Sequence, residues 1–288
     1  MKDLNYQLIK LCRENRDGSY STQATRRRIL DLIANQLHEL GYRRMQTKSL
    51  KPKHIDALVS RWKDQSIGIG TFKNRLSALR WWANKVGKAD IMPKNNSAFD
   101  IGNRSYVGKE SKAQDLDEKR LEKISDPYVR LSLRLQAEFG LRREEAIKFS
   151  PNYAIKDDHI KLKASWTKGG RARTVPIRTN EQRRLLEEVG KLAKGGALIP
   201  PERNYVEQRN RYDSQVRIAR IKNPHGLRHA YAQRRYEEET GWKSPLAGGP
   251  SRSDPSADER ALDRQARAVI SRELGHDREQ ITATYLGR

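Results

Sequence analysis

The 288-residue sequence contains little cysteine and no long hydrophobic run. Its single cysteine, Cys12, cannot form an internal disulfide and supplies too few ligands for a structural zinc site. No apolar stretch approaches the ~20 residues that cross a bilayer. The N-terminal residues mix charges into their apolar positions, which argues against a signal peptide. These absences favour a protein of the reducing cytoplasm and exclude a membrane as its partner.

Negative charge is also in short supply. Lys and Arg number 59 against 36 Asp and Glu, which gives a net charge of +23. Such self-repulsion is typical of a protein with a polyanionic partner. No segment combines a basic helix face with a broad aromatic or leucine face, so nucleic acid is favoured over a lipid surface. A ribosome-associated or architectural protein stays open at this point, because basicity says nothing about chemistry.

Helical periodicity dominates residues 1–93. Apolar residues recur at helical spacing in "STQATRRRILDLIANQLHELGY", "LKPKHIDALVSRWKDQ" and "TFKNRLSALRWWANKVGK". Ser21 and Thr22 are the predicted caps of the first helix, Pro52 opens the second, and Thr71 caps the third. Because three outward faces share one sign, they predict a DNA-facing surface, with a solvated face as the alternative. Its candidate residues are Arg26, Arg27, Arg28, Lys51, Lys53, Lys73, Arg75 and Arg80.

The rest of the chain changes character twice. A polar, aperiodic stretch at 94–111 predicts a linker, and 112–288 predicts a second domain. Within it, "YAIKDDHIKLKASWTKGGRARTVPI" alternates apolar and polar residues, which predicts a small antiparallel sheet of two or three strands. Clustered Gly, Pro and Ser at 243–259 predict a long mobile insertion. The fold class is therefore mainly α with a small antiparallel β-sheet (α+β).

Two segments of the second half carry residues suited to phosphate chemistry. "FGLRREEAIKF" places Arg142 just past a glycine helix stop, with Glu145 three residues on. "SWTKGGRARTVPI" places Lys168 in a tight Gly-Gly hairpin turn, from which a long cationic side chain reaches outward. Each residue alone is more often a solvated surface group, so neither motif predicts a site by itself.

Two later segments add histidines and a tyrosine. "NPHGLRHAYAQRR" places His225 and Arg228 on one helix face, with Pro224 at the predicted first helical position. "LGHDREQITATY" supplies His276 and Tyr285. For each histidine the simpler interpretation is a structural role, in which its side chain bonds a backbone carbonyl at the start of a helix. The co-occurrence of all these residues, in this order and after a basic helical bundle, is what favours an active site.

The order Arg, Lys, His-x-x-Arg, His, Tyr resembles the tyrosine recombinase (phage integrase) family. The likeness runs through "GLRREE", "TKGGRARTVPI", "HGLRH" and "LGH" with a tyrosine nine residues after its histidine. It covers roughly 112–288, and "TGWKSPLAGGPSRSD" with "ISRELGHDREQITATYLGR" is similar to one bacterial integrase subgroup. The resemblance implies a helical core-binding (SAM-like) DNA-binding bundle at 1–93 and a tyrosine-recombinase catalytic domain at 112–288.

The resemblance also implies roles for the charged residues. Tyr285 is the nucleophile that forms a 3′-phosphotyrosyl intermediate. Arg142 and Arg228 hold the phosphate oxygens, for which bidentate guanidinium groups are well suited. Lys168 is the acid that protonates the departing 5′ oxygen. A cationic neighbourhood makes that proton easier to release.

The remaining implied roles belong to His225, His276 and Glu145. His225 accepts or relays the proton of Tyr285 or bonds a phosphate oxygen, and His276 donates a hydrogen bond to the phosphate. Glu145 orients Arg142 or a histidine. Neither a metal nor another cofactor is expected, because the arginines supply the charge neutralisation that Mg²⁺ provides in other phosphoryl-transfer sites.

These inferences predict a site-specific recombinase or integrase of a bacterial mobile genetic element, cytoplasmic and nucleoid-associated. Its expected partner is double-stranded DNA with a specific recombination site, bound as a homotetramer, with a monomer or weak oligomer when free. DNA-bending accessory proteins are further candidate partners. The alternatives are a type IB topoisomerase, which relaxes DNA by similar chemistry, and a non-catalytic basic DNA-binding protein.

The end of the chain raises a separate expectation. Only "LGR" follows Tyr285, whereas many relatives continue with a helix that docks on a neighbouring protomer. We therefore expect the segment after His276 to be loosely held in the free protein and ordered by DNA or a partner protomer.

Overall fold

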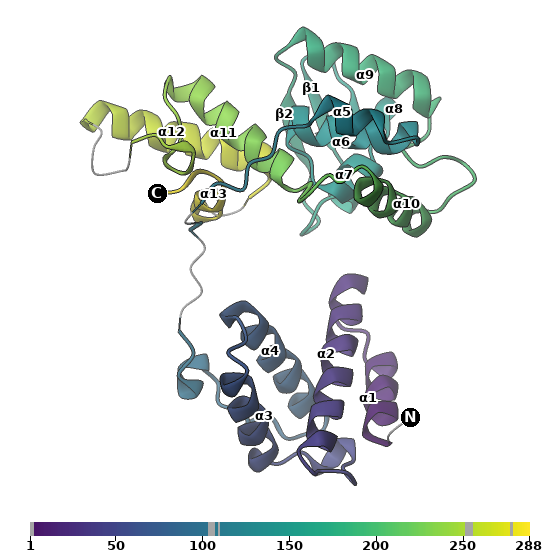
Figure 1. Ribbon diagram of the computed structural model, residues 1–288, viewed down its shortest axis with the longest axis vertical. Helices are drawn as coiled ribbons and strands as arrows, with labels where there is room; N and C mark the ends of the chain where they lie inside the picture. The colour runs from purple at the N-terminus through teal and green to yellow at the C-terminus, as the bar shows by residue number, and fades with distance from the viewer. Residues whose placement is uncertain (1–2, 103–106, 109, 251–255, 277–278) are drawn as a thin grey trace. The chain divides into compact units, whose positions relative to one another are not determined.

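The computed structural model divides the chain into two compact units, Met1–Arg104 and Ser105–Arg288 (Figure 1). The residues that it describes are 3–102, 107–108, 110–250, 256–276 and 279–288, without the side chains of 279 and 280. The predicted fold class is confirmed, because the described residues form helices and one two-stranded antiparallel sheet. None of the described helices combines the length and the apolar character that a membrane crossing requires.

The first unit is a helical bundle closed by short 3₁₀ turns. Its elements are α1 (Asp3–Glu14), α2 (Tyr20–Glu39), η1 (Thr47–Ser49), α3 (Pro52–Asp64), α4 (Ile69–Lys85), η2 (Ala89–Ile91) and η3 (Asn96–Phe99). Trp62 and Trp82 are fully buried at its centre, among the leucines and isoleucines of the predicted stripes. Phe99 and Ile101, which we assigned to the linker, also pack against this core. The unit thus continues past residue 93.

The helix starts in this unit differ from the prediction at two places. Ser19, not Ser21 or Thr22, caps α2, and its Oγ accepts a hydrogen bond from the backbone N of Thr22 at 3.3 Å. Ser19 has the extended backbone that a capping side chain needs, which decides among three chemically suitable residues. The residue preceding α4 is Gly68, so Thr71 lies inside the first turn of that helix. The prediction that Pro52 opens α3 is confirmed.

The second unit surrounds its small sheet with helices. Its elements are α5 (Glu118–Glu122), α6 (Pro127–Phe139), α7 (Arg143–Ile147), α8 (Pro151–Ala154), β1 (His159–Leu162), η4 (Ala164–Trp166), β2 (Arg173–Pro176), α9 (Asn180–Ala193), α10 (Tyr205–Ile218), α11 (Gly226–Thr240), η5 (Pro245–Ala247), α12 (Ala257–Leu274) and α13 (Glu279–Leu286).

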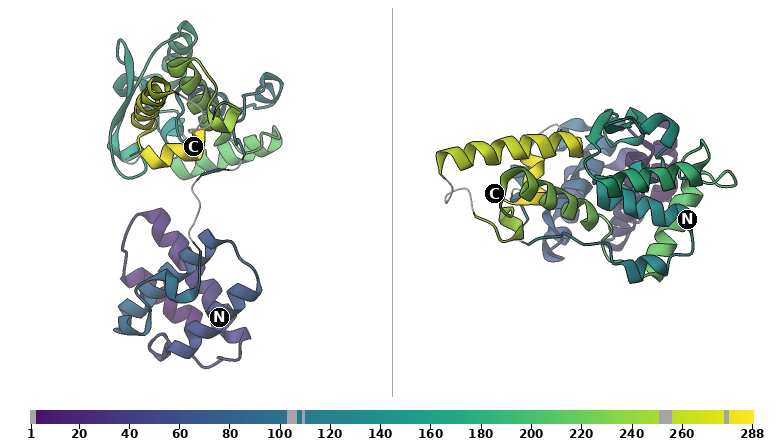
Figure 2. Two further views of the ribbon diagram at one scale, coloured as in Figure 1. Left: turned by 90° about the vertical axis from the view of Figure 1, so that its left-hand side faces the viewer. Right: turned by 90° about the horizontal axis from the view of Figure 1, so that it is seen from above.

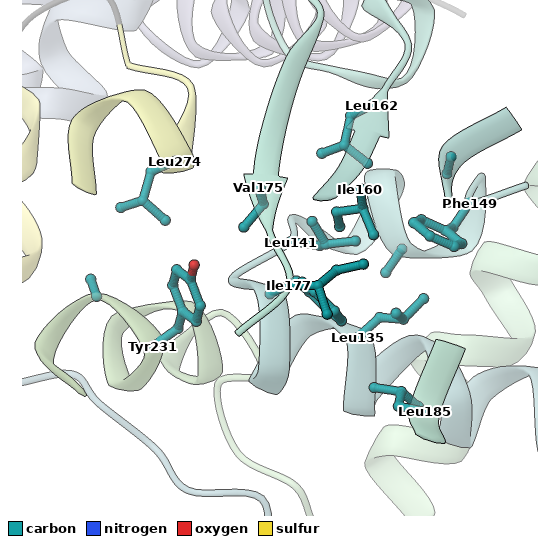
Figure 3. Packing of buried hydrophobic residues seen from close by; sticks show 14 of the residues in the cluster. Leu135, Leu141, Phe149, Ile160, Leu162, Val175, Ile177, Leu185, Tyr231 and Leu274 are labelled. Atoms are coloured by element: carbon teal, nitrogen blue, oxygen red, sulfur yellow. The ribbon is translucent and has the colours of Figure 1, made fainter. Parts of the chain in front are cut away.

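The predicted sheet forms, with β1 antiparallel to β2 and Leu162 paired with Arg173. Helix α8 packs against β1 and α12 against β2. The side chains of Val175 and Ile177 lie next to Leu141, which belongs to the connection between α6 and α7, as Figure 3 shows. The connection between the strands runs over residues 163–172 and includes η4. The tight turn predicted around Lys168 is present, because the Gly170 N–H donates to the Thr167 carbonyl at 3.2 Å, but it lies within a ten-residue loop and does not join the strands directly.

Three helices at the C-terminal end of the chain pack together. Helix α13 contacts both α11 and α12, and the C-terminus lies beside them (Figure 2). The insertion predicted at 243–259 is structured at both ends, because η5 packs on α13 and α12 begins at Ala257. Residues 251–255 of that insertion lie outside the described part of the chain.

Candidate active site

Arg142 stands at the start of α7, directly after the turn that ends α6. Gly140 closes α6 in the left-handed conformation (φ +60°), and a Cβ there would lie 2.4 Å from the Tyr231 ring, so glycine is required twice over. The predicted link to Glu145 is present: the Arg142 backbone N donates to Oε2 at 2.7 Å, and Nη1 donates to Oε1 at 2.8 Å. Glu145 is completely buried.

Arg228 is the most deeply buried arginine of the site, with 1% of its surface exposed. Its Nη1 donates to the carbonyl of Gly140 and its Nη2 to the carbonyl of Leu274. Its Nε lies 3.4 Å from the Tyr285 hydroxyl and its Nη2 lies 3.3 Å from Nε2 of His276. Burial, followed by the charge of Arg142, lowers the pKa of Arg228 to about 10, so the guanidinium stays charged at neutral pH.

Tyr285 is docked in this pocket, with 6% of its surface exposed. Its hydroxyl lies 3.4 Å from Nε2 of His225. Gln233 donates to the carbonyl of Tyr285 at 3.0 Å, and Arg267 donates to the carbonyl of Gly287 at 2.8 Å. The expectation of a loosely held segment was therefore wrong for α13, because long-range bonds from α11 and α12 hold its backbone.

The two predicted histidines both lie next to the tyrosine. The ring of His276 stacks on Tyr285 at a centroid distance of 5.3 Å, and the ring of His225 is 6.0 Å away. Burial and the neighbouring Arg228 and Arg142 lower the pKa of His225, and the same causes lower the pKa of His276 to about 3. Both imidazoles are thus neutral at physiological pH, and His225 can accept a proton.

His225 differs from the prediction in its local position. It is the residue before α11, which begins at Gly226, so Pro224 lies outside the helix. Gly226 is needed because a Cβ there would lie 2.4 Å from the Gln114 side chain and 2.6 Å from the Lys112 carbonyl oxygen. The segment before α5 therefore packs across the start of α11 through this glycine.

Lys168 is not brought to the cluster. It is exposed on the 163–172 loop, and no hydrogen bond or ion pair joins its ammonium to another described residue. Gly169 and Gly170, which follow it, both have positive φ angles, so the loop bends sharply beside the lysine. Arg142, Arg228, Tyr285 and the two histidines thus lie together in the structure, whereas Lys168 is exposed on its loop.

Arg173 and His229 are two further candidate residues that the sequence did not single out, although both lie within motifs that carry the family resemblance. Arg173, in "TKGGRARTVPI", donates to both carboxylate oxygens of Glu145 at 2.7 Å. His229, in "HGLRH", is 3% exposed, and its ring lies 4.4 Å from that of Tyr285. The signals were local. Arg173 shares a strand face with the buried Val175, and His229 follows His225 by one helical turn.

His229 is a buried histidine with an unusual environment. Burial, followed by electrostatic interaction with the neighbouring His225 and Lys112, lowers its pKa to about 4. Its Nδ1 is buried and has no hydrogen-bond partner among the described residues. A neutral imidazole therefore packs against the ring of Tyr285, on the side that faces α11.

The residues predicted to bind DNA fall into two groups within the first unit. Arg27, Arg28, Lys51 and Lys53 are exposed, as expected. Arg26 is half-buried, with its guanidinium 4.4 Å from the centre of the Trp81 ring. The remaining residues do not face outward as predicted, because the packing of α4 half-buries them; they are Lys73, Arg75 and Arg80.

The two half-buried arginines of α4 contact the bundle itself. Arg75 lies 5.4 Å from the centre of the Trp62 ring, and Arg80 donates to the carbonyl of Pro93 at 3.1 Å. In the described part of the molecule, no group of three or more His, Cys, Asp or Glu side chains is placed to hold a metal ion.

Two family models match parts of this chain. Residues 1–92 match the family model for the phage integrase N-terminal domain, and residues 102–234 match the integrase model. The chain belongs to the tyrosine recombinase family. No curated protein matches the chain.

Solved structures of tyrosine recombinases have the same fold. XerH recombinase in a post-cleavage complex with palindromic difH DNA is 17% identical (TM-score 0.58; 98% of this chain and 80% of that chain). A lambda integrase dimer on a COC′ core site is 14% identical (TM-score 0.63; 98% and 76%). The Tn1549 transposon integrase with circular intermediate DNA is 14% identical (TM-score 0.56; 100% and 96%).

Proposed function

We propose that this chain is a site-specific DNA recombinase that cleaves and rejoins DNA strands through a 3′-phosphotyrosyl intermediate. One observation carries the proposal: the Tyr285 hydroxyl lies 3.4 Å from both Nε of Arg228 and Nε2 of His225, in a buried pocket of the same chain. A nucleophile, a guanidinium and a neutral base thus meet at one oxygen, as in-line attack on a phosphodiester requires. The placement supports delivery of the tyrosine in cis.

The cleavage step follows from these contacts. The Tyr285 oxygen attacks phosphorus and its proton passes to Nε2 of His225. The bond from phosphorus to the 5′ oxygen breaks, and Lys168 protonates that oxygen when DNA draws the 163–172 loop inward. Religation reverses each transfer, so the bond energy is kept in the phosphotyrosyl link.

The arginines stabilise the charge that develops on phosphorus. Arg142 and Arg228 hold the non-bridging oxygens, and His276 adds a hydrogen bond. Two carbonyls hold Arg228, and the second hydrogen of Nη1 remains available for a phosphate, whereas Nη2 also lies 3.3 Å from Nε2 of His276. A preorganised group of this kind loses no free energy to reorientation during the reaction.

The positive charge and the family membership support DNA binding and assembly of several copies on DNA. A lambda integrase structure of this fold is a tetramer on a Holliday junction, and we extend that arrangement to this chain. The first unit, with its exposed cations on α2 and α3, is proposed to grip the duplex. The setting that fits is the bacterial nucleoid and the integration of a mobile element.

Covalent capture tests the proposal. A pool of nicked duplexes with randomised inverted repeats is incubated with the protein, and DNA that stays attached in SDS is recovered and sequenced. We expect an enriched site, an adduct from wild-type protein and none from Tyr285→Phe. Tyr212→Phe is the matched control, because it also removes a buried phenol hydroxyl that bonds one side chain, Gln136.

Three results would count against the proposal. An adduct formed by the Tyr285→Phe variant would show that another residue is the nucleophile. Adducts without any enriched site would favour relaxation by a topoisomerase-like reaction. Binding without any adduct would leave a non-catalytic DNA-binding protein.

A further inference from the structure

Arg173 is the first residue of β2, and all three nitrogens of its guanidinium group donate hydrogen bonds to other parts of the protein. Nη1 and Nη2 donate to Oε1 and Oε2 of Glu145, both at 2.7 Å, and Nε donates to the carbonyl of Glu273 at 2.8 Å. Its side chain is only 6% exposed. A planar fork that meets both carboxylate oxygens at once has one geometry, which a lysine cannot reproduce. The strand that leaves the Lys168 loop is thereby tied to two other parts of the site.

Glu145 is the point where two arginines meet. It accepts four hydrogen bonds, two from Arg173 and two from Arg142. Burial alone would raise its pKa, but the hydrogen bond and charge of Arg173, with the charges of Arg228 and Arg142, lower it to about 2. The carboxylate is therefore always charged, and its demand for donors has to be met inside the protein.

The donors that bind Glu145 determine how many hydrogen bonds Arg142 makes to it. Because Arg173 takes one position on each oxygen, the Arg142 side chain bonds Glu145 through Nη1 alone. Its Nη2 and Nε have no acceptor among the described residues, and the side chain is 21% exposed. Without Arg173, the same buried carboxylate would draw Arg142 into a bidentate pair and turn its donors away from DNA.

The third bond of Arg173 reaches the other side of the pocket. The Glu273 carbonyl that it binds precedes the Leu274 carbonyl held by Arg228. Gly275 follows in the left-handed conformation (φ +64°), and a Cβ there would lie 2.8 Å from Cδ of Arg173. The arginine thus fills the space beneath the turn that presents His276.

We propose that Arg173 is a positioning residue for strand cleavage: it saturates Glu145 so that Arg142 keeps donors free for the scissile phosphate, and it supports the turn that carries His276. The inference rests on the proposed function of the site. Arg173 does not touch DNA in this role. Its effect reaches the reaction through Arg142 and His276.

The experiment compares Arg173→Gln with a matched arginine. Arg178 comes two residues after β2 and binds a buried carboxylate, the side chain of Glu273, and among the described residues it makes no hydrogen bond or ion pair with Arg142 or Tyr285. Arg178→Gln therefore reports the cost of losing a buried ion pair without the proposed role. Both variants are assayed as full-length protein on the duplex that wild-type protein selects by covalent capture. The measurements are the DNA dissociation constant, the adduct rate constant at saturating protein, and the melting temperature.

We expect Arg173→Gln to lower the adduct rate constant on the order of 100-fold, as a misplaced catalytic group does, with an unchanged dissociation constant. Arg173→Lys should recover little of the rate, because its point charge cannot fork. Arg178→Gln should lower the melting temperature and leave the rate unchanged. Equal rates for Arg173→Gln and wild-type protein would overturn the inference. Absence of any wild-type adduct would instead overturn the proposed function.

A double-mutant cycle separates positioning from folding. If Arg173 acts through Arg142, adding Arg173→Gln to Arg142→Ala should slow cleavage much less than it slows wild-type protein. Fully multiplicative losses would overturn the coupling. Should Arg173→Gln fold poorly, Glu145→Gln is added, because a neutral pair leaves no unpaired buried charge. That folded pair should still cleave slowly, and a wild-type rate would overturn the proposal.

Discussion

The two units of this chain hold themselves together in different ways. Among the described residues of Met1–Arg104, the buried polar side chains are the neutral Asn5, Gln36 and His54, and no Asp, Glu, Lys or Arg is buried. The second unit buries charges of both signs. They are Asp126, Glu145, Arg228, Arg235, Asp263, Arg267 and Glu273.

The difference identifies where the chemistry is. A buried charge is retained only if hydrogen bonds and an opposite charge offset its desolvation, and an apolar side chain of the same size is often as stable. The first unit uses apolar packing, which suffices for the stable basic surface that the proposed function requires. On the same proposal the second unit holds guanidinium groups ready for a phosphate, and each such group requires carboxylates and carbonyls around it.

The largest expected loss of stability comes from removing a buried charge of the second unit, and it is compared with the removal of a buried amide of the first unit. Glu273→Ala removes the carboxylate that binds Arg178, Arg235 and the hydroxyl of Tyr231, and it should cost about 3–5 kcal/mol of unfolding free energy. Gln36→Ala removes the acceptor of the Trp62 indole N–H, at 2.8 Å, and should cost about 1–3 kcal/mol.

Hydrogen exchange on peptides of the full-length protein would measure both losses of unfolding free energy, because it reports the stability of each unit separately. Equal losses in the two units would break the comparison.

A smaller effect concerns acid stability. The pKa of His229 is lowered to about 4 in the folded protein, from about 6.5 in an unfolded chain. The folded state therefore binds fewer protons than the unfolded state between these values, and stability is lost as pH falls from about 6.5 to 4. For His229 alone the loss approaches about 3 kcal/mol at pH 4.

His229→Gln tests this expectation, because it keeps a polar group but removes the titration. The unfolding free energy of the second unit should then fall less steeply below pH 6.5 than in wild-type protein. His38→Gln, at a half-buried position on α2 of the first unit, is the control. An identical pH slope for the His229 variant and wild-type protein would contradict the assignment.

The smallest effect is on the exposed surface of the first unit. Arg27 is exposed on α2, so Arg27→Ala should change stability by less than about 0.5 kcal/mol. If it contacts a phosphate, DNA binding should weaken and the slope of log K against log salt should decrease by about 1. Lys10→Ala, on α1 and outside the predicted surface, should leave the slope unchanged. The same slope for Arg27→Ala and wild-type protein would remove Arg27 from the DNA-binding surface.

The parts predicted well are those that neighbouring residues decide. The helical stripes, the antiparallel sheet and the link from Arg142 to Glu145 at three residues' spacing all follow from local periodicity. Ser19 was missed as a cap because several residues nearby have the same capping chemistry. Lys168 lies in the tight turn that its two glycines predicted, but the strand pairing ends at Leu162 and Arg173, so this turn does not join the strands directly.

The site itself depends on contacts across long stretches of chain. Arg173 and Glu145 are 28 residues apart, and Arg228 and Tyr285 are 57 apart. No periodicity links such pairs, so Arg173 escaped notice among many basic residues. The docking of α13 was missed for the same reason, since its bonds come from Gln233 and Arg267 on other helices.

The sequence by itself determined the helices, the basic character and the set of residue types from which a phosphate-handling site can be built. Only the tertiary structure decided which arginines remain free to bind a ligand and which are committed to the protein. The physical reason is that the cost of burying a charge depends on its surroundings in space. Arg142 and Arg173 have the same chemistry, and the number of acceptors around each one sets its role.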